Sequence, residues 1–307
     1  MLGRILHWPT CPACDSWRLT TLAQFPSKRS IPPESRPAVC GCRHCGIVYY
    51  SPIPSRQQAD DYYEAEDGWE SARDMHKLAD PSYVNPKKHQ MFGAIYDRLT
   101  PHLAGELLAR PERRVLDFGC GPGWFLDVFR QHGWQTTGLE PAPRVRQYAA
   151  HRHRMLAELG DDAYDLIVAN HVLEHVTSPR DTLRDLVARL TPGGYLYLGV
   201  PNLAALEQTG YLKPFINSHH LFAYTPESLT NLLAAERVRV VARYTSGDAK
   251  GFRRFVLVAQ RTGQRVRRVR HPLRQVEQAF GKLSRGGNRN WLRAKPDASA
   301  PRGASAA

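Results

Sequence analysis

From Pro111 onward, hydrophobic and polar positions follow two regular patterns along the chain. Short apolar runs of strand length are separated by stretches in which apolar positions recur with the spacing of a helix. The apolar runs cover residues 114–118, 135–140, 164–170 and 194–200, and the helical stretches cover 124–133, 145–152 and 182–190. Strands that alternate with helices predict an α/β fold that is doubly wound around a mostly parallel sheet.

The same patterns predict elements on both sides of this region. A helix is expected over residues 88–99, where Met91, Ile95 and Leu99 recur every four residues. A second helix, from Pro226 to Glu236, has Thr225 as its N-terminal cap. Strands at 238–244 and 255–259 follow it and complete the expected domain.

These patterns divide the chain into four segments. Residues 1–50 are rich in cysteine, proline and aromatic residues without helical periodicity, so we expect a module whose small apolar core is supplemented by bound metal. Residues 51–110 are polar and aromatic and predict a helical connector or lid. The α/β domain spans 111–262, and 263–307 form a basic amphipathic tail whose last dozen residues are expected to be disordered.

A glycine-rich turn lies between the first predicted strand and the helix that begins at Trp124. Its glycines at 119, 121 and 123 allow the backbone to approach a ligand closely, and free N–H groups at the helix start attract an anionic group. A dinucleotide-binding fingerprint would need glycine in place of Trp124, so a nicotinamide dehydrogenase is disfavoured. Glu140, at the end of the next strand, could accept hydrogen bonds from both hydroxyls of a ribose. Without Glu140, a tight turn with no ligand would explain the glycines equally well.

Four segments resemble, in order, the motifs of class I S-adenosylmethionine-dependent methyltransferases: residues 116–123, 138–141, 164–176 and the turn at 190–194. The resemblance covers about half of the chain. It implies a seven-stranded, Rossmann-like sheet in which the glycine loop contacts the methionine part of the cofactor, the acid holds the ribose, and residues after the fourth strand line the methyl-transfer site. The cofactor-binding residues that it implies are Asp117, Gly119, Cys120, Gly121, Gly123, Glu140, Asn170 and His171. For an adenine contact the chain offers only the weakly matching segment 155–158.

Five of the six cysteines lie in the first 45 residues, which favours metal binding over disulfides in a reducing compartment. Two C-x-x-C pairs, Cys11 with Cys14 and Cys42 with Cys45, can present four thiolates to one tetrahedral zinc ion. The segment resembles the zinc-binding segment that precedes the catalytic domain in some bacterial methyltransferases of sugars and other small molecules. Such a zinc-ribbon-like module would hold a structural zinc, because four thiolates leave no open coordination position. Reduced core cysteines or a redox pair are the alternatives, and Cys40 and His44 are spare donors.

Methyl transfer from a sulfonium ion is an in-line displacement, so the enzyme must align the acceptor and, where the acceptor carries a proton, remove it. Glu174 and His175 follow the fourth strand and are candidates for this role. His219 and His220, in the connection after the fifth strand, are a second pair of candidates, because loops at the carboxyl ends of strands build substrate pockets. Alternatively, Glu174 and His175 only cap or pack, and the second pair is solvated or anchors a lid.

The sequence also bears on the acceptor. No proline–aromatic motif that would hold a flipped base occurs after the fourth strand, and Cys120 is the only cysteine of the catalytic domain. We therefore expect transfer to oxygen or carbon of a small molecule, a sugar or glycan precursor, or a lipid, and we rank nucleic acid below these. A non-catalytic adaptor that binds the cofactor or zinc, and an RNA methyltransferase, are the alternative functions.

The net charge of +13 belongs mainly to the tail, where residues 264–307 contain 11 Lys and Arg against two acids. The charge therefore indicates no nucleic-acid surface on the body. Within the tail an apolar stripe recurs every three or four residues, at Val266, Val269, Leu273, Val276, Phe280 and Leu283. We expect this stripe to pack onto the body, with peripheral membrane contact as the alternative. Since neither a signal peptide nor a membrane span is recognised, a cytoplasmic location is expected.

Overall fold

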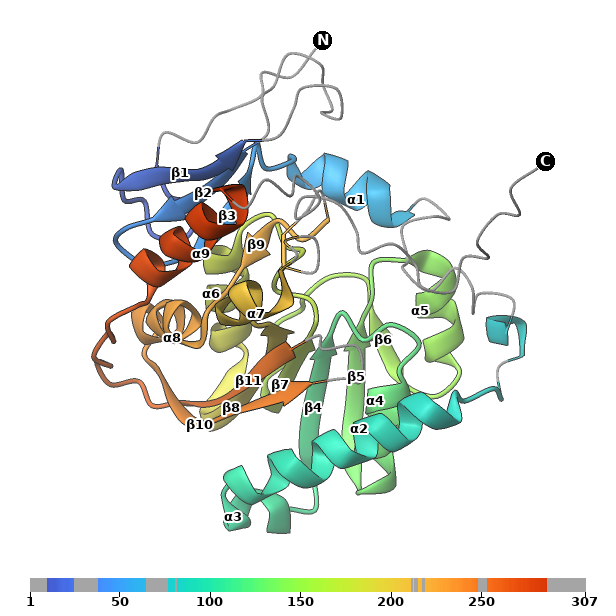
Figure 1. Cartoon of the computed structure of the whole chain (residues 1–307). Helices are drawn as coiled ribbons and strands as arrows, with labels where there is room; N and C mark the ends of the chain where they lie inside the picture. The colour runs from blue at the N-terminus through green and yellow to red at the C-terminus, as the bar shows by residue number, and fades with distance from the viewer. Residues whose placement is uncertain are drawn as a thin grey trace, which may run out of the picture.

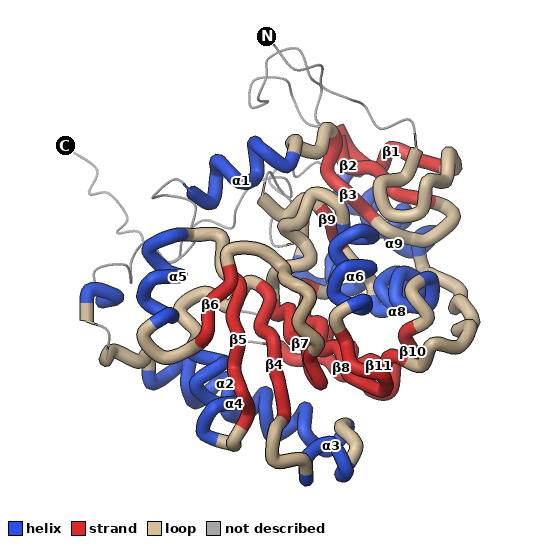
Figure 2. The backbone as a smooth tube through the Cα atoms, turned by 180° about the vertical axis from the view of Figure 1, so that it is seen from behind, coloured by secondary structure: helices blue, strands red, loops and turns tan. Residues whose placement is uncertain are grey.

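The computed structural model describes residues 10–24, 38–64, 77–80, 82–210, 212, 215–216, 219–247 and 253–285. Its largest element is a seven-stranded sheet with the strand order β6-β5-β4-β7-β8-β11-β10 (Figures 1 and 2). The strands are β4 (Arg113–Phe118), β5 (Trp134–Leu139), β6 (Arg154–Leu156), β7 (Tyr164–Asn170), β8 (Leu190–Pro201), β10 (Val238–Gly247) and β11 (Arg253–Arg261). The strands from β6 to β8 are parallel, whereas β11 is antiparallel to β8 and β10 to β11. The predicted doubly wound, mostly parallel sheet is confirmed.

Helices cover both faces of this sheet. One face packs against α2 (Pro86–Leu99), α3 (Gly105–Ala109) and α4 (Trp124–Gln131), and the other against α6 (Pro179–Ala188) and α8 (Pro226–Ala235). Alternate residues of β7 enter the two cores: Leu166 and Val168 join the first, Ile167 and Ala169 the second. A strand buried on both faces has no polar side, which is why residues 164–170 form a nearly continuous apolar run. The helix α5 (Pro143–Ala150) lies beside β6 at the sheet's edge (Figure 2).

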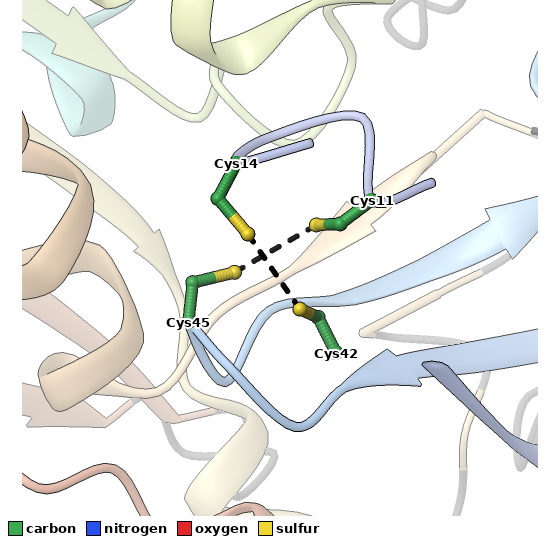
Figure 3. A group of neighbouring side chains, drawn as sticks. All are labelled: Cys11, Cys14, Cys42 and Cys45. Atoms are coloured by element: carbon green, nitrogen blue, oxygen red, sulfur yellow. Dashed lines mark hydrogen bonds between the residues drawn. The ribbon is translucent and has the colours of Figure 1, made fainter. Parts of the chain in front are cut away.

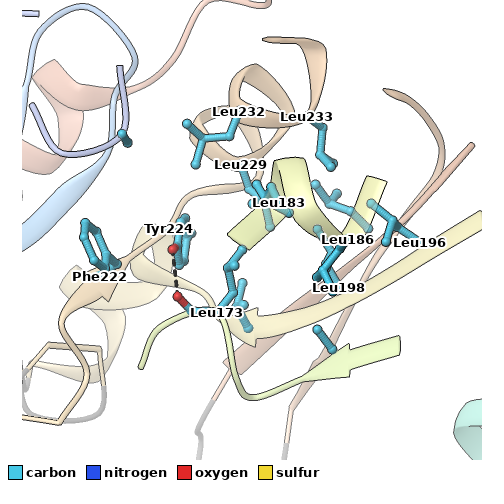
Figure 4. Close-up of a cluster of buried hydrophobic side chains, with 14 of the residues drawn as sticks. Leu173, Leu183, Leu186, Leu196, Leu198, Phe222, Tyr224, Leu229, Leu232 and Leu233 are labelled. Carbon is cyan, nitrogen blue, oxygen red and sulfur yellow. Dashed lines mark hydrogen bonds between the residues drawn. The ribbon is translucent and has the colours of Figure 1, made fainter. Parts of the chain in front are cut away.

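The cysteine-rich segment forms a second sheet with the order β1-β2-β3-β9. Its strands β1 (Leu19–Gln24), β2 (Ala38–Cys42) and β3 (Val48–Ser51) come from the N-terminal region, and α1 (Arg56–Glu64) follows them. The short fourth strand β9 (Phe222–Ala223) comes from the α/β domain and pairs antiparallel with β3, Tyr49 opposite Phe222. We call this sheet, together with the loops that carry Cys11, Cys14, Cys42 and Cys45, the zinc module, after the metal that these cysteines are expected to bind. Its buried side chains are continuous with the core around α6 and α8, part of which Figure 4 shows.

The tail packs onto the other face of the zinc module through α9 (Leu273–Arg285) (Figure 1). Leu273, Val276 and Phe280 are buried together with residues of β2, β3 and the short helix α7 (Leu206–Thr209). The expected packing of the apolar stripe onto the protein's own body is what the structure shows for this helix. Val269, before the helix, is 43% exposed. The end of the tail, including the last dozen residues, lies outside the described residues.

Two details of the fold differ from the sequence expectation. Residues 190–194, which we interpreted as a turn, form the first part of β8, where the register passes from Tyr164 opposite Leu190 to Leu166 opposite Tyr195. The turn-like sequence is therefore an irregular part of the strand that shifts the register, with Gly193 at a φ of 77°. The strand β6 was not predicted, since three residues are too few for a periodic signal. Among the described residues, no helix is long and apolar enough to cross a membrane.

Candidate functional site

The glycine loop lies at the carboxyl end of β4, next to the carboxyl end of β7. The chain leaves β4 toward β5 and β6 and then returns to β7 on the other side, and this reversal of strand order opens the crevice in which such sheets bind ligands. Gly119, Gly121 and Gly123 have φ angles of 76°, 53° and 79°, which side-chain-bearing residues rarely adopt. A Cβ on Gly119 would lie 2.5 Å from Val172. The glycine loop therefore touches the loop that follows β7.

Glu140 is connected to the glycine loop by hydrogen bonds. Its carboxylate accepts the backbone N–H of Gly121 at 2.9 Å and that of Ala142 at 2.9 Å, and only 5% of the residue is exposed. Burial raises the pKa of Glu140, while the two N–H groups and the charge of Arg146 partly oppose this. The structure thus places the acid that is predicted to bind the ribose beside the loop that is predicted to contact the methionine part of the cofactor.

Two further residues of the implied cofactor site are buried at the same place. Burial and the nearby charge of Glu140 raise the pKa of Asp117 to about 8. The Cys120 thiol lies against Gly138, where an added Cβ would be 2.7 Å from its sulfur. Burial and the charge of Asp117 raise the pKa of Cys120 well above its ordinary value. A buried thiol with a raised pKa is a poor nucleophile, which agrees with the argument against cysteine-dependent base methylation.

Asn170 and His171 end β7 and begin the next loop. The Asn170 Oδ1 is buried near Gly199 and has no hydrogen-bond partner in the part of the chain that the structure describes. A buried amide oxygen without a partner is costly, so a bound ligand that donates to it would fit this position. His171 has a left-handed backbone with a φ of 59°, and its Nδ1 lies 3.1 Å from Oε1 of Glu174.

The four candidate catalytic residues do not all come together. Glu174, His175 and His220 each place a nitrogen or oxygen donor within 4.8 Å of the others, and the rings of His175 and His220 meet edge to face with centroids 4.7 Å apart. His219 is exposed and does not belong to this group. Burial alone would raise the pKa of Glu174, but the hydrogen bond from His171 and the neighbouring histidine charges hold it below its ordinary value.

The strand β9 links this cluster to the zinc module. Phe222 donates its backbone N–H to the carbonyl of Glu174 at 3.1 Å, and the Tyr224 hydroxyl donates to the carbonyl of Leu173 at 2.9 Å (Figure 4). On the module's side, Tyr50 donates its N–H to the carbonyl of Leu221 at 2.8 Å. One short strand therefore holds the loop of Glu174, the segment after His220 and β3 in a fixed relation.

The four cysteines of the two C-x-x-C pairs converge on one point (Figure 3). The sulfur atoms of Cys11 and Cys45 are 3.7 Å apart, and those of Cys14 and Cys42 are 3.6 Å apart. A tetrahedral zinc ion with bonds of about 2.3 Å separates its sulfur ligands by roughly 3.8 Å, so the four side chains fit zinc. Hydrogen bonds from Cys11, Cys14 and Cys45 hold the pKa of Cys42 far below its usual range, which favours a thiolate there. Cys40 does not belong to this group.

Sequence reasoning missed a buried ionic cluster behind the glycine loop. Asp127, on α4, is 3% exposed and accepts a hydrogen bond from Arg152 at 3.0 Å, and His153 lies 3.2 Å away. Arg152 also donates to the carbonyl of Pro122 at 2.9 Å. Through this last bond the cluster holds the backbone of the glycine loop in place. The signal in the sequence was an acid among the apolar positions of residues 124–129.

Comparison with known proteins agrees with this geometry. Residues 88–238 match the family model described as a methyltransferase domain. A tRNA U34 carboxymethyltransferase of Saccharophagus degradans is 34% identical over 119 residues, which are 34% of this chain and 35% of that protein. A ubiquinone biosynthesis O-methyltransferase of Vibrio cholerae is 28% identical over 129 residues, or 38% and 51% of the two chains. The chain spans about half the length of the first curated relatives that it matches.

Solved structures show the same fold. The crystal structure of a magnesium protoporphyrin IX methyltransferase from Synechocystis, with bound SAH, superposes with a TM-score of 0.50 and 16% identity, over 67% of this chain and 100% of that chain. The family-model match begins within α2 and ends at the start of β10, so it contains the glycine loop, Glu140 and the loop after β7. Residues 88–238 are therefore similar to methyltransferase domains and have the fold of the class I S-adenosylmethionine-dependent methyltransferases.

Proposed function

We propose that this chain transfers the methyl group of S-adenosylmethionine to an oxygen or carbon atom of a small molecule, a sugar or glycan precursor, or a lipid. The observation that carries the cofactor assignment is the hydrogen bond from Gly121 to the buried Glu140. It joins the loop that would contact the methionine part to the acid that would hold the ribose. In this proposal the cofactor is held by Asp117, Gly119, Cys120, Gly121, Gly123, Glu140, Asn170 and His171.

The acceptor side of the proposal rests on the loop after β7. A Cβ on Gly119 would meet Val172, so the cofactor loop is in contact with the loop that carries Glu174 and His175. His220 lies beside Glu174 and His175, in the segment before β9. A cluster of one carboxylate and two imidazoles can accept or orient a proton of the acceptor, which suits transfer to a hydroxyl or to an acidic carbon. His175 and His220 are the candidate bases, and His219 is a weaker candidate because it lies outside the cluster.

Zinc in the module would have a structural role. The four thiolates would complete a tetrahedral site, so no coordination position would be left for a substrate. Through the pairing of β3 with β9, the module would hold the segment of His220 against the loop of Glu174.

The experiment that tests the proposal has two stages. Calorimetry of the full chain with S-adenosylmethionine and S-adenosylhomocysteine measures cofactor binding, and we expect dissociation constants in the micromolar range. Methyl transfer from labelled cofactor is then measured on hydroxylated metabolites, nucleotide-linked sugars, lipid extracts and RNA. A protein that binds neither cofactor form contradicts the proposal and favours the adaptor alternative.

An RNA methyltransferase is a second candidate, because one relative is named as acting on tRNA. Label found only in RNA, together with RNA binding that weakens steeply with salt, would establish this alternative.

A further inference from the structure

A role as a catalytic residue does not explain the surroundings of Glu174. It is 1% exposed, and its two carboxylate oxygens have different environments. Oε1 lies 3.1 Å from Nδ1 of His171, whereas Oε2 is buried and has no hydrogen-bond partner among the described residues. Leaving a buried carboxylate oxygen unsatisfied costs free energy, so this atom points to a ligand that is positively charged or donates a hydrogen bond.

Two imidazoles lie beside the Glu174 carboxylate. The donor atoms of Glu174, His175 and His220 all lie within 4.8 Å of one another. Donors bound at about 2.1 Å to one metal ion are separated by roughly 3 to 4.2 Å, so small side-chain movements would bring all three onto a single ion. The ring of His220 meets that of His175 edge to face, an orientation that two imidazole ligands on adjacent coordination positions can adopt.

We propose that Glu174, His175 and His220 form a binding site for a divalent cation, separate from the four-cysteine site. Two imidazoles and one carboxylate suit zinc, manganese or iron, and three protein ligands leave coordination positions open for a substrate. His171 supports the site from outside, because its contact with Oε1 of Glu174 orients the carboxylate and leaves Oε2 for the metal.

The backbone around the three residues is arranged as a metal site requires. Glu174 and His175 belong to one short turn, which His175 closes by donating its N–H to the carbonyl of Val172 at 2.9 Å. The turn is joined to β9 by the bond from Phe222 to the carbonyl of Glu174. His220 therefore approaches the two ligands of the turn from a segment that this bond holds in place. Ligands held by rigid backbone lose little entropy when a metal binds.

This inference rests on the proposed function for its chemical role and defines the acceptor more closely. A hydroxyl group bound to the cation loses its proton to solvent more readily, because the metal lowers its pKa. The oxygen lone pair then attacks the methyl carbon, an O–C bond forms, and the C–S bond breaks with its electron pair returning to sulfur. The products are a methyl ether and neutral S-adenosylhomocysteine. The site therefore selects acceptors whose hydroxyl can coordinate a metal, and the two histidines, candidate bases in the metal-free protein, act as ligands once the metal is bound.

Manganese titration of the full chain tests the site directly. The protein is first given one equivalent of zinc, which the four thiolates bind in preference to nitrogen and oxygen donors, and Mn²⁺ binding is then measured as loss of the free-ion electron paramagnetic resonance signal. We expect about one Mn²⁺ per chain. The variants Glu174→Gln and His220→Ala should each weaken binding at least about tenfold. His219→Ala, at the exposed neighbouring histidine, is the matched control and should bind Mn²⁺ like the unmodified protein.

Calorimetry with S-adenosylhomocysteine on the same samples shows that each variant is folded and separates the two proposals. Cofactor binding without Mn²⁺ binding would overturn the metal site and leave the methyltransferase proposal standing. Mn²⁺ binding without cofactor binding would do the reverse. Equal Mn²⁺ affinity in the unmodified protein and in His220→Ala, or an equal loss in His219→Ala, would also overturn the site.

Discussion

Glu140 accepts hydrogen bonds from the backbone N–H groups of Gly121 and Ala142, so its carboxylate is fixed beside the glycine loop. We predict that Glu140→Ala weakens S-adenosylmethionine binding by about 1 to 3 kcal/mol, because charge-assisted hydrogen bonds to the ribose hydroxyls are lost. Calorimetry measures the change. Glu112→Ala, an exposed glutamate before the amino end of β4, is the control and should leave the affinity unchanged. Equal dissociation constants for Glu140→Ala and the unmodified protein would contradict the cofactor assignment.

Asp117 gives the cofactor-free protein a specific pH dependence. Its pKa of about 8 in the folded state lies above the ordinary 3.8 because of burial and the charge of Glu140. The folded state binds this proton more tightly than the unfolded state, so the protonated carboxyl stabilises the folded state fully below about pH 4. This stabilisation is lost as the pH rises through 8, where the folded state also gives up the proton. Between pH 5 and 8 the free energy of unfolding should therefore fall more steeply in the unmodified protein than in Asp117→Asn, by up to about 1.4 kcal/mol per pH unit. Denaturant titrations at several pH values measure this, and parallel curves would show that Asp117 does not titrate in this range.

Among the elements, β9 joins the zinc module to the methyltransferase domain by pairing with β3. We predict about one structural zinc per chain in protein prepared without chelator, measured by elemental analysis. Cys45→Ser should lower the zinc content and speed amide hydrogen exchange in β2, β3 and also Leu221–Tyr224, because β9 pairs with β3. Cofactor binding should persist, since the glycine loop lies outside this sheet.

The matched control for the zinc site is Cys40→Ser. Cys40 lies on β2 but outside the four-cysteine group, so this variant should keep its zinc. Unmodified protein that contains no metal would contradict the zinc assignment. Faster amide exchange that is confined to β2 and β3 in Cys45→Ser would contradict the coupling between the zinc module and β9.

The helix α9 stabilises the module from its other face. Phe280 is 1% exposed and packs among residues of the zinc module and α7, so Phe280→Ala should lower the free energy of unfolding by about 3 to 5 kcal/mol. Val269→Ala, at a position 43% exposed, should change it by less than about 0.5 kcal/mol. Denaturant unfolding compares the two variants. Because Leu273, Val276 and Phe280 of the stripe are covered by the body, the full chain should not float with anionic vesicles. Salt-sensitive flotation that depends on the tail would revive the membrane alternative.

At the scale of the whole molecule, the sequence predicts the strands and motifs that can be recognised within one short segment. Strands buried on both faces form nearly continuous apolar runs, as in β7, and the two C-x-x-C pairs have the spacing that a metal site requires. Gly121 and Glu140 could be paired because strand order in parallel sheets places consecutive carboxyl ends at one edge. These features depend on neighbours that are close in the sequence or related by a regular topology.

What the sequence did not predict depends on contacts between distant segments. The two residues of β9 are too few for a strand signal, and their pairing with β3 follows from the packing of the zinc module on the catalytic domain. His175 and His220 were separate candidates, and nothing in their spacing indicated that their rings would meet. The choice between His219 and His220 likewise depends on which of the two adjacent side chains the backbone before β9 turns inward.

The pairing of β3 with β9 also has a consequence for how the protein is made. During synthesis β3 leaves the ribosome long before its partner strand, whereas β4, β5, β6, β7 and β8 follow one another and share nearby contacts. The half of the site that would hold the cofactor can therefore assemble on the nascent chain first. The half that would hold the acceptor has to wait for β9. A growing chain would thus be able to hold S-adenosylmethionine before it could recognise anything to methylate.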